Sequence, residues 1–329
     1  MTALAVGVAV VAVVVIAAVV VLRSHRGQPS LAGGPPLSSC LTSTQAATAA
    51  DASGPAPSGG VRVTSIAELL DTLADDAVTD IVVANGTYHV SPSSGQAADS
   101  LWIGARYAGR TRPVTVRAET PCGVTFDGAG ATPFGCISFE QGAHDQTWDG
   151  FRCANGTPSM TGVIVFGGYA GEAAPHHITL RSWSLLGSLT SQSTGATDHG
   201  VYFSEAVGGP HDIVLDNLAV DGSGGLDSAI HAFHSDAANT NAWNVTITRL
   251  SVWGTGQALI LWDDTLHDWT ISDSTITGAT DYAVRYESLG ATGIRFVNVT
   301  STGSGTGRGF YSSLGDNPPG VTFVNTNLH

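Results

Sequence analysis

The sequence contains no lysine and few basic residues of any kind. All 13 of the residues counted as Lys or Arg are arginines, against 27 Asp and Glu, and the formal net charge is −14. Such a chain is repelled by phosphate backbones and anionic headgroups, so neither nucleic acid nor an anionic lipid surface is an expected partner. Uronic-acid polymers stay open, because calcium or a local arginine cluster can offset the repulsion. Neutral sugars are the simpler expectation.

Cysteine is also scarce, and no two cysteines have the C-x-x-C spacing that is typical of zinc sites. The four are Cys40, Cys122, Cys136 and Cys153. An even number of well-separated cysteines favours disulfides in an oxidising compartment, and four cysteines allow three pairings.

A long apolar run occupies the N-terminus. Residues Ala3 to Leu22 carry no charge, and about 20 residues at about 1.5 Å rise span about 30 Å of hydrocarbon. We therefore expect residues 1–22 to be a transmembrane anchor or an uncleaved signal. Arg23 and Arg26 follow the run, which by the positive-inside rule places the rest of the chain in the cytoplasm. The downstream composition is instead typical of an extracellular domain, and we expect a single-pass protein that faces outward.

Two further segments precede the repeats. Residues 23–60 are rich in Ser, Ala, Gly, Pro and Thr without apolar periodicity, which indicates a flexible linker. The domain expected over residues 61–329 opens with a short helix at residues 65–77, where Ser65 and Glu68 have capping-box spacing. Its apolar stripe consists of Ile66, Leu69, Leu70, Leu73 and Ala77.

Short β-rich runs then repeat in two series. The first series starts at Val114, Ile137, Val163, Val201, Ile230, Leu259, Val284 and Phe310, and the second at Val124, Ile178, Ile213, Val245, Trp269, Ile294 and Val321. Starts in the first series are 23 to 38 residues apart, too close for β-α-β crossovers and too irregular for propeller blades. The pattern predicts a coil of parallel strands with at least two strands in each rung.

Three features carry a resemblance to a known family: IVVANGTY at Ile81–Tyr88, GVTFDG at Gly123–Gly128, and the stacked rungs. The segment from about Val61 to His329 resembles the pectate-lyase-like superfamily of right-handed parallel β-helices. The resemblance implies an all-β solenoid whose N-terminal helix caps the open end. It also implies a ladder of polar turn residues, for which the matching positions are Asn217, Arg249, Asp273, Asn298 and Asn325.

The cysteines can be placed on such a coil. Cys136 opens a rung and Cys153 ends the same rung, where a closed coil brings its ends together. We therefore favour a Cys136–Cys153 disulfide, which leaves Cys40 and Cys122 as the second pair.

Outward side chains of the first series should form columns, because neighbouring rungs stack about 4.8 Å apart. The column at the second strand position reads Thr115, Ser138, Ile164, Tyr202, His231, Ile260, Arg285 and Tyr311. The preceding column reads Thr161, His199, Ser228, Gln257, Tyr282 and Arg308, and the following one Gly167, Glu205, His234, Asp263 and Ser288. From the fourth rung onward this face is dense in His, Tyr, Arg and carboxylates, which fits carbohydrate processing.

Two enzymatic mechanisms use these columns. In a lyase, Arg285 or Arg308 would neutralise a uronate carboxylate while His231 or Tyr202 removes the adjacent proton. In a hydrolase, Glu205 and Asp263 would flank the glycosidic oxygen two rungs apart, about 9.6 Å, near the inverting range of about 6.5–9.5 Å. The Gly-His-Gly and Arg-x-Lys elements of polygalacturonases and the Arg-x-Pro-x-x-Arg signature of pectate lyases are absent, so no family catalytic set is carried over.

The candidate residues follow from these columns. The catalytic candidates are Glu205, His231, Asp263 and Arg285. The substrate-binding candidates are His199, Tyr202, His234, Trp262, Tyr282, Arg308 and Tyr311. Trp262 is expected to face the groove, whereas Trp269 is expected in the core. A non-catalytic β-helix that binds glycans or cell-wall material is the alternative.

Metal binding has two candidate locations. Asp198, Asp227 and Asp281 recur just before strands, where they would bind calcium or cap turns. His176-His177 lacks a third ligand at a convincing spacing, and no metal is expected there.

Overall fold

The computed structural model describes residues 59–91, 99–128, 135–155, 162–167, 171–185, 198–223, 225–233, 240–305 and 309–328. Residues 1–22 and residues 23–58 of the expected linker lie outside these ranges. Among the described residues, no helix is both long and apolar enough to cross a membrane.

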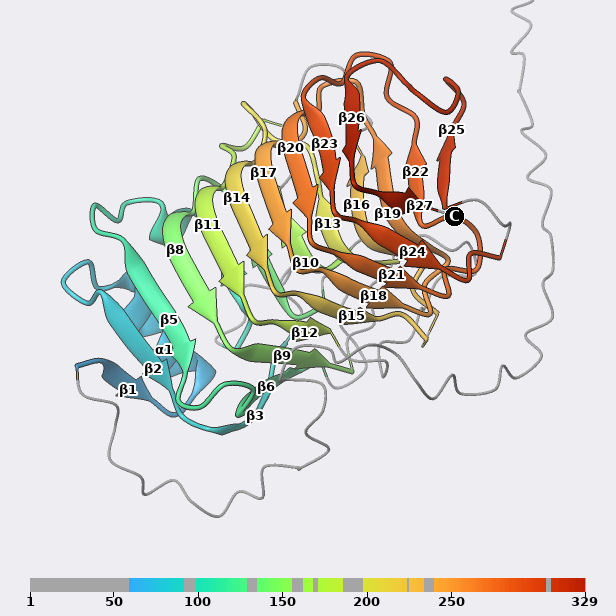
Figure 1. The fold of residues 1–329 in the computed structure, drawn as a ribbon. Helices are drawn as coiled ribbons and strands as arrows, with labels where there is room; N and C mark the ends of the chain where they lie inside the picture. The colour runs from blue at the N-terminus through green and yellow to red at the C-terminus, as the bar shows by residue number, and fades with distance from the viewer. Residues whose placement is uncertain are drawn as a thin grey trace, which may run out of the picture. The chain divides into compact units, whose positions relative to one another are not determined.

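The described strands form three sheets, called A, B and C here, in which every strand is parallel to its neighbours (Figure 1). Sheet A contains β1 (Val61–Val63), β2 (Asp80–Val83), β5 (Val114–Ala118), β8 (His144–Asp149), β11 (His176–Arg181), β14 (His211–Asp216), β17 (Trp243–Thr248), β20 (His267–Ser272), β23 (Ile294–Val297) and β26 (Val321–Val324). Sheet B contains β3 (Gly86–His89), β6 (Val124–Asp127), β9 (Phe151–Ala154), β12 (Ser184–Leu185), β15 (Ala219–Asp221), β18 (Ser251–Trp253), β21 (Thr275–Thr277), β24 (Thr300–Thr302) and β27 (Asn327–Leu328). Sheet C contains β4 (Trp102–Ile103), β7 (Ile137–Phe139), β10 (Gly162–Phe166), β13 (His199–Phe203), β16 (Ser228–Phe233), β19 (Gln257–Trp262), β22 (Val284–Tyr286) and β25 (Phe310–Ser312).

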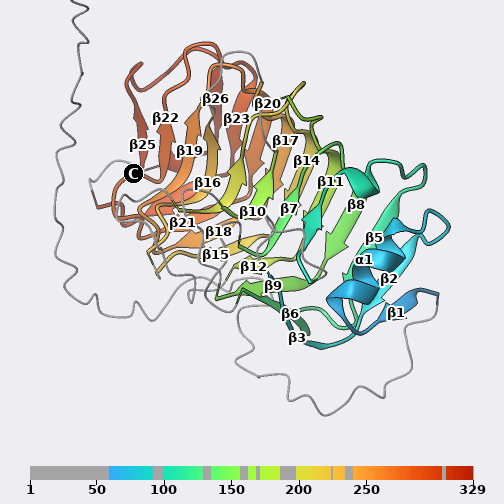
Figure 2. The same cartoon turned by 180° about the vertical axis from the view of Figure 1, so that it is seen from behind.

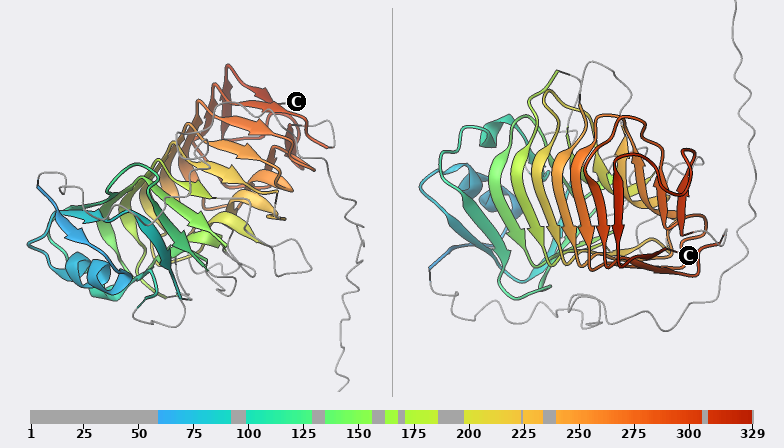
Figure 3. Two further views of the ribbon diagram at one scale, coloured as in Figure 1. Left: turned by 90° about the horizontal axis from the view of Figure 1, so that it is seen from below. Right: turned by 45° about the horizontal axis from the view of Figure 1, so that its top comes forward.

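The chain visits the sheets in a fixed order. From β5 onward each rung passes through A, then B, then C, before the next rung begins beside it in A. Figures 1 and 3 show the strands of sheet A lying side by side along the solenoid. Insertions fall in the connections, so rungs of unequal length still keep their strands in register. The described domain is a right-handed parallel β-helix, and the fold predicted from the repeats is confirmed.

The predicted alignment of the first rung was wrong. Val114 belongs to β5 of sheet A and pairs with Gln146, whereas Ile137 lies in β7 of sheet C. Val124 likewise lies in β6 of sheet B, so Thr115 is not on the predicted face. The sequence shows two strong apolar series, and the strands of sheet B, only two to four residues long, produce no third series that can be recognised.

The register of β10 was also misassigned by one residue. Ile164 pairs with Val201 and points inward, whereas Val165 pairs with Tyr202 and belongs to the outward column. Gly167 therefore aligns with Ser204 rather than with Glu205. All four residues from Val163 to Phe166 are apolar and buried, so the sequence offers no alternation from which the strand face can be determined.

Stacked aromatic rings fill the interior. Phe139, Phe166 and Phe203 stack on consecutive rungs of sheet C with ring centroids 5.2 Å apart at both contacts. Trp269 packs edge-on against Phe203 and is fully buried, as predicted. Its indole N–H donates to the carbonyl of Ala242 at 2.8 Å, so its burial leaves no unpaired donor.

Helix α1 (Ile66–Ala74) closes the N-terminal end of the core. The Ser65 hydroxyl accepts a hydrogen bond from the Glu68 N–H at 3.1 Å, and the Glu68 carboxylate accepts from the Thr64 N–H at 2.7 Å. Ile66, Leu69, Leu70 and Leu73 are buried, as the apolar stripe predicted. The helix ends before the predicted residue 77, because Asp75 has an extended conformation.

The predicted turn ladder lies at the corner between sheets A and B. Asn217, Arg249, Asp273, Asn298 and Asn325 all have left-handed φ between 50° and 58°. The Asn298 side-chain amide donates to the Asp273 carboxylate at 2.8 Å, and that of Asn325 donates to Asn298 at 3.3 Å. Asn and Asp tolerate this conformation better than most residues, so the ladder sets a short corner that repeats rung after rung.

Cys136, just before β7, and Cys153, in β9, form a disulfide with an S–S distance of 2.17 Å. Cys122 is also disulfide-bonded. Cys40, its expected partner, lies outside the described residues.

Candidate functional site

The outward face of sheet C carries the candidate site. Figure 2 shows β7, β10, β16, β19, β22 and β25 following one another along this sheet. The paired registers give one outward column, which reads Trp102, Ser138, Val165, Tyr202, His231, Ile260, Arg285 and Tyr311. Polar and aromatic residues thus concentrate from β13 onward, where the sequence placed them.

His199, Tyr202 and His231 form a tight aromatic cluster at β13 and β16. The His231 Nδ1 lies 2.7 Å from the His199 Nε2, and the His199 Nδ1 lies 2.9 Å from the Ser228 hydroxyl oxygen. The His199 and His231 rings meet edge to face at 4.1 Å, and the Tyr202 ring stacks on His199 at 5.5 Å. The sequence placed these side chains in the same region of the face, and the structure brings them into contact.

Burial controls the protonation of this cluster. It lowers the pKa of His199 well below its ordinary value, and it lowers the pKa of His231 to about 3, to which the positive charge of Arg285 also contributes. Burial raises the pKa of Tyr202 to about 12, with a smaller contribution from the Glu205 carboxylate. At neutral pH the cluster therefore consists of two neutral imidazoles and a neutral phenol.

Arg285 lies against the exposed aromatic ring of this face. Its guanidinium carbon is 4.8 Å from the centroid of the Trp262 ring, and its Nε donates to Glu287 at 2.7 Å. Trp262 is 42% exposed, so part of its ring is open to solvent. Farther along, Tyr282 and Tyr311 stack with centroids 4.6 Å apart. Aromatic rings thus line the face over its last rungs.

Asp227 is the carboxyl group with the most altered protonation on this face. Burial raises its pKa to about 6, the nearby Arg285 opposes the rise, and the neighbouring Asp198 and Asp281 add to it. Asp198, Asp227 and Asp281 occupy equivalent register positions before β13, β16 and β22. Asp198 and Asp227 are one rung apart, and Asp227 and Asp281 are two rungs apart. Gly256 takes this position on the intervening rung, where an added Cβ would lie 2.8 Å from the Asp227 carbonyl oxygen. The sequence predicts these aspartates only as calcium ligands or turn caps.

On strands β16 and β19 of this face, two buried polar atoms lack a hydrogen-bond partner in the described residues. They are the His231 Nε2 and the Gln257 side-chain oxygen, which come from adjacent strands. Buried polar atoms are normally hydrogen-bonded, so these two mark groups that a ligand can satisfy.

The carboxylate pair predicted for a hydrolase has a different environment from the one expected. Asp263 is buried, and its carboxylate accepts from the Thr265 N–H at 2.6 Å and from the Thr265 hydroxyl at 2.7 Å. It therefore caps the turn after β19. Glu205 follows β13, where its charge acts on Tyr202. His234 and Arg308 lie outside the described residues.

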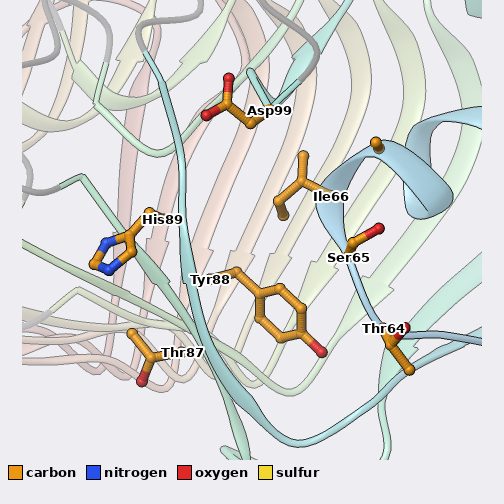
Figure 4. A pocket seen from close by; sticks show the side chains of 8 residues that line it. Thr64, Ser65, Ile66, Thr87, Tyr88, His89 and Asp99 are labelled. Atoms are coloured by element: carbon orange, nitrogen blue, oxygen red, sulfur yellow. The ribbon is translucent and has the colours of Figure 1, made fainter.

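The cavity of about 370 Å³ beside α1 is a poor alternative site (Figure 4). Its titratable side chains already have partners: Asp99 accepts from the Ser91 hydroxyl at 2.8 Å, and the His89 ring lies 3.6 Å from Asp127. Figure 4 shows His89 and Asp99 apart from one another, and no acid–base pair converges there.

One cluster on sheet A supplies His177 with potential ligands that the spacing in the sequence did not show. His177 has two partners on the next rung, His211 and Asp212, and each residue offers one ligand atom within 4.8 Å of the others. No other group of three such residues meets this criterion in the described ranges, so Asp198, Asp227 and Asp281 do not. The sequence did not reveal the cluster, because His177 and Asp212 are distant in the chain and meet only through the register of β11 and β14.

The strand order decides the fold. This chain has a right-handed parallel β-helix fold. No protein-family model and no curated protein matches the sequence. A PL6 family polysaccharide lyase from Pseudopedobacter saltans is 14% identical with a TM-score of 0.45, covering 75% of this chain and 64% of that one.

Two further solved structures are similar in the same way. The PL6 family alginate lyase AlyGC is 11% identical with a TM-score of 0.38, covering 77% of this chain and 40% of that one. The catalytic unit of a GH87 α-1,3-glucanase from Streptomyces thermodiastaticus is 14% identical with a TM-score of 0.30, covering 84% and 70%. This chain spans less than two thirds of the two lyases, and likeness at this level carries no argument about activity.

Proposed function

We propose that this protein is a glycoside hydrolase that cleaves a polysaccharide on the outward face of sheet C, with Asp227 as the proton donor. The observation that carries the proposal is the pKa of Asp227, which burial raises to about 6 beside other carboxylates on the same face. Glycoside hydrolysis needs one carboxyl group that keeps its proton near neutral pH and a second that is ionised.

Asp281 is the partner that fits best. Asp198 is fully buried, whereas Asp281 is partly exposed. Asp227 and Asp281 lie two rungs apart, about 9.6 Å by strand spacing, close to the range of about 6.5–9.5 Å that leaves room for a water molecule. Gly256 contributes no side chain between them. The pair therefore replaces the Glu205 and Asp263 pair expected from the sequence.

The proposed step conserves atoms and charge. Asp281 accepts a proton from water, whose oxygen forms a bond to the anomeric carbon. The bond from that carbon to the glycosidic oxygen breaks, and the departing oxygen takes the proton from Asp227. Attack from the face opposite the leaving group inverts the anomeric configuration.

Local charge favours a neutral glycan as the substrate. The Arg285 guanidinium donates a hydrogen bond to the Glu287 carboxylate, so the charge of Arg285 is already compensated. Asp227 and Asp281 lie nearby, and a polyuronate would add further negative charge to this region. The Trp262 ring, held beneath Arg285, offers a stacking surface for a sugar ring.

A uronate lyase is the second candidate, and the cluster of His199, Tyr202 and His231 favours it. The neutral His231 would remove the proton next to the uronate carboxylate, and the neutral Tyr202 phenol would protonate the leaving oxygen. Arg285 would neutralise the charge of the carboxylate. This assignment ranks second because a histidine with a pKa of about 3 is a weak base at neutral pH. A β-helix that only binds glycans would need neither the aspartate pair nor the histidine and tyrosine cluster.

We also propose an extracellular, membrane-anchored location through residues 1–22.

The test uses the full-length protein in mild detergent, since residues 1–22 are expected to enter a membrane. It is incubated with neutral and acidic polysaccharides, with and without calcium, while reducing ends and the ultraviolet absorbance of unsaturated products are measured. We expect new reducing ends from a neutral glycan without unsaturated product. Asp227→Asn should abolish them, whereas Asp273→Asn, at the distant A–B corner, should not.

Other outcomes would overturn this proposal. Unsaturated product from an acidic glycan would select the lyase candidate. Bound glycan without cleavage across the panel would select the binding role. Full activity in Asp227→Asn would remove Asp227 from the chemistry.

A further inference from the structure

A stack of aromatic rings runs across sheet A at the N-terminal ends of its strands. His144, His176, His211, Trp243 and His267 occupy one register position on five consecutive strands. Their successive ring centroids are 4.8, 4.9, 4.4 and 5.3 Å apart, with interplanar angles of 18° or less. The stack holds each ring at a fixed height and orientation.

Each stacked residue is followed by one with a left-handed backbone. The five followers are Asp145, His177, Asp212, Asn244 and Asp268, with φ between 50° and 58°. Where the follower is an aspartate, its carboxylate lies 2.8 or 2.9 Å from the Nδ1 of the preceding histidine. The repeat thus places imidazole–carboxylate pairs at the N-terminal ends of the strands of sheet A.

His177 breaks this repeat, because a second imidazole stands where the other stacked residues are followed by a carboxylate or an amide. Its Nε2 lies 3.4 Å from the Asp212 carboxylate, which is also 2.8 Å from the His211 Nδ1. One carboxylate oxygen of Asp212 thereby lies between two imidazoles. The side chain of His177 is 55% exposed, and those of His211 and Asp212 are partly exposed, so an ion from solution can reach all three.

We propose that His177, His211 and Asp212 bind a divalent transition-metal ion of the zinc type. Two imidazole nitrogens and one carboxylate oxygen are the ligands that zinc accepts, whereas calcium and magnesium prefer oxygen alone. Three protein ligands leave a fourth position open to water or to an outside ligand. This site is on a different sheet from the proposed catalytic aspartates and does not depend on them.

Neighbouring side chains hold the ligands in place. The Asn244 side-chain amide donates to the other oxygen of Asp212. The His176 Nδ1 lies 2.7 Å from the His177 Nδ1, which leaves the His177 Nε2 directed at Asp212. His211 is sandwiched between His176 and Trp243. Such outer contacts orient metal ligands and raise affinity.

The experiment measures zinc binding to the chelator-stripped, full-length protein by calorimetry and follows cobalt substitution through its visible absorption. We expect His177→Gln and Asp212→Asn each to weaken zinc binding by about tenfold or more. The matched control is His267→Gln, which removes a histidine from the same stack with its own aspartate partner and should bind zinc within about twofold of the wild type. Calcium should not displace the zinc.

Each result has a defined meaning. Wild-type affinity in both His177→Gln and Asp212→Asn would overturn the site. Equal weakening by His267→Gln would mean that the whole stack, and not these three residues, attracts metal. Because His177 is exposed, its variant should keep the thermal midpoint of the wild type, so lost binding cannot be assigned to unfolding.

Discussion

The ring nitrogens of His231 and His199 lie 2.7 Å apart, with His199 on β13 and His231 on the next strand of sheet C. One nitrogen must carry a proton and the other must accept it, so the contact is a hydrogen bond only while at least one ring is neutral. Burial keeps the pKa of both histidines low, so both are neutral at neutral pH. This contact therefore depends on pH.

The first prediction concerns stability in acid. The pKa of His231 is about 3 in the folded chain against 6.5 for the free group, so its stabilising contribution is complete above pH 6.5 and is lost as the pH falls toward 3. Asp227 acts in the opposite direction, because its raised pKa makes the folded state lose stability as the pH rises from 3.8 to about 6. His231 loses about 2.7 kcal/mol between pH 6.5 and pH 4.5, and Asp227 regains about 2 kcal/mol as the pH falls from about 6 to 4.5. His199 adds a further loss, so the free energy of unfolding should be lower at pH 4.5 than at pH 7. Urea unfolding at the two pH values measures the change, and His231→Gln should reduce it. An equal loss in that variant would contradict the assignment.

The second prediction concerns the aromatic interior. Phe166 stacks between Phe139 and Phe203 and is fully buried. Phe166→Ala should lower the free energy of unfolding by about 3–5 kcal/mol, because it removes buried surface and leaves a cavity. Phe166→Leu, which fills more of the space, should have a smaller effect. Urea denaturation measures both, and a loss below about 1 kcal/mol in the alanine variant would show that the ring is not part of a close-packed core.

The third prediction concerns the corner between sheets A and B. Asn298 has a φ of 53° and donates to Asp273. Asn298→Ala should lower the free energy of unfolding by about 1–2 kcal/mol, because alanine is less stable in this conformation and the hydrogen bond is lost. Asn298→Gly keeps the conformation and should lose less. Comparable losses in the two variants would mean that the backbone conformation contributes little.

The fourth prediction concerns glycan recognition and rests on the proposed function. Trp262→Ala should weaken binding of a neutral oligosaccharide by roughly tenfold, because the stacking surface is lost and Arg285 loses its aromatic support. Trp262 is 42% exposed, so the thermal midpoint should change little. Trp253→Ala on sheet B is the matched control and should retain affinity. Calorimetry with the full-length protein distinguishes the two variants.

The sequence predicted the architecture because the solenoid repeats one pattern many times. Apolar residues alternate in β13, β16 and β22, and their registers were correct. The predicted register of β10 was wrong because Val163 to Phe166 are apolar at every position, so nothing in the sequence indicates which residues face inward. The strands of sheet B were not recognised as a third series because, at two to four residues, they are too short to show a periodicity.

The candidate site was predicted only in part. Alternation placed His199, Tyr202, His231 and Arg285 on one face. Protonation depends on burial, which the sequence does not contain, and so the raised pKa of Asp227 became visible only in the folded chain. The cluster of His177, His211 and Asp212 required the register between rungs, a long-range property.

The polar corner between sheets A and B has a further consequence. From β11 to β27 this corner always has two residues, whereas the connections from B to C and from C to A vary in length. Both variable connections border sheet C. The corner of constant length thus keeps the rungs aligned, while the connections beside the proposed site can differ in length from rung to rung. For the proposed enzyme, substrate preference can therefore change through insertions and deletions in these connections without disturbing the scaffold.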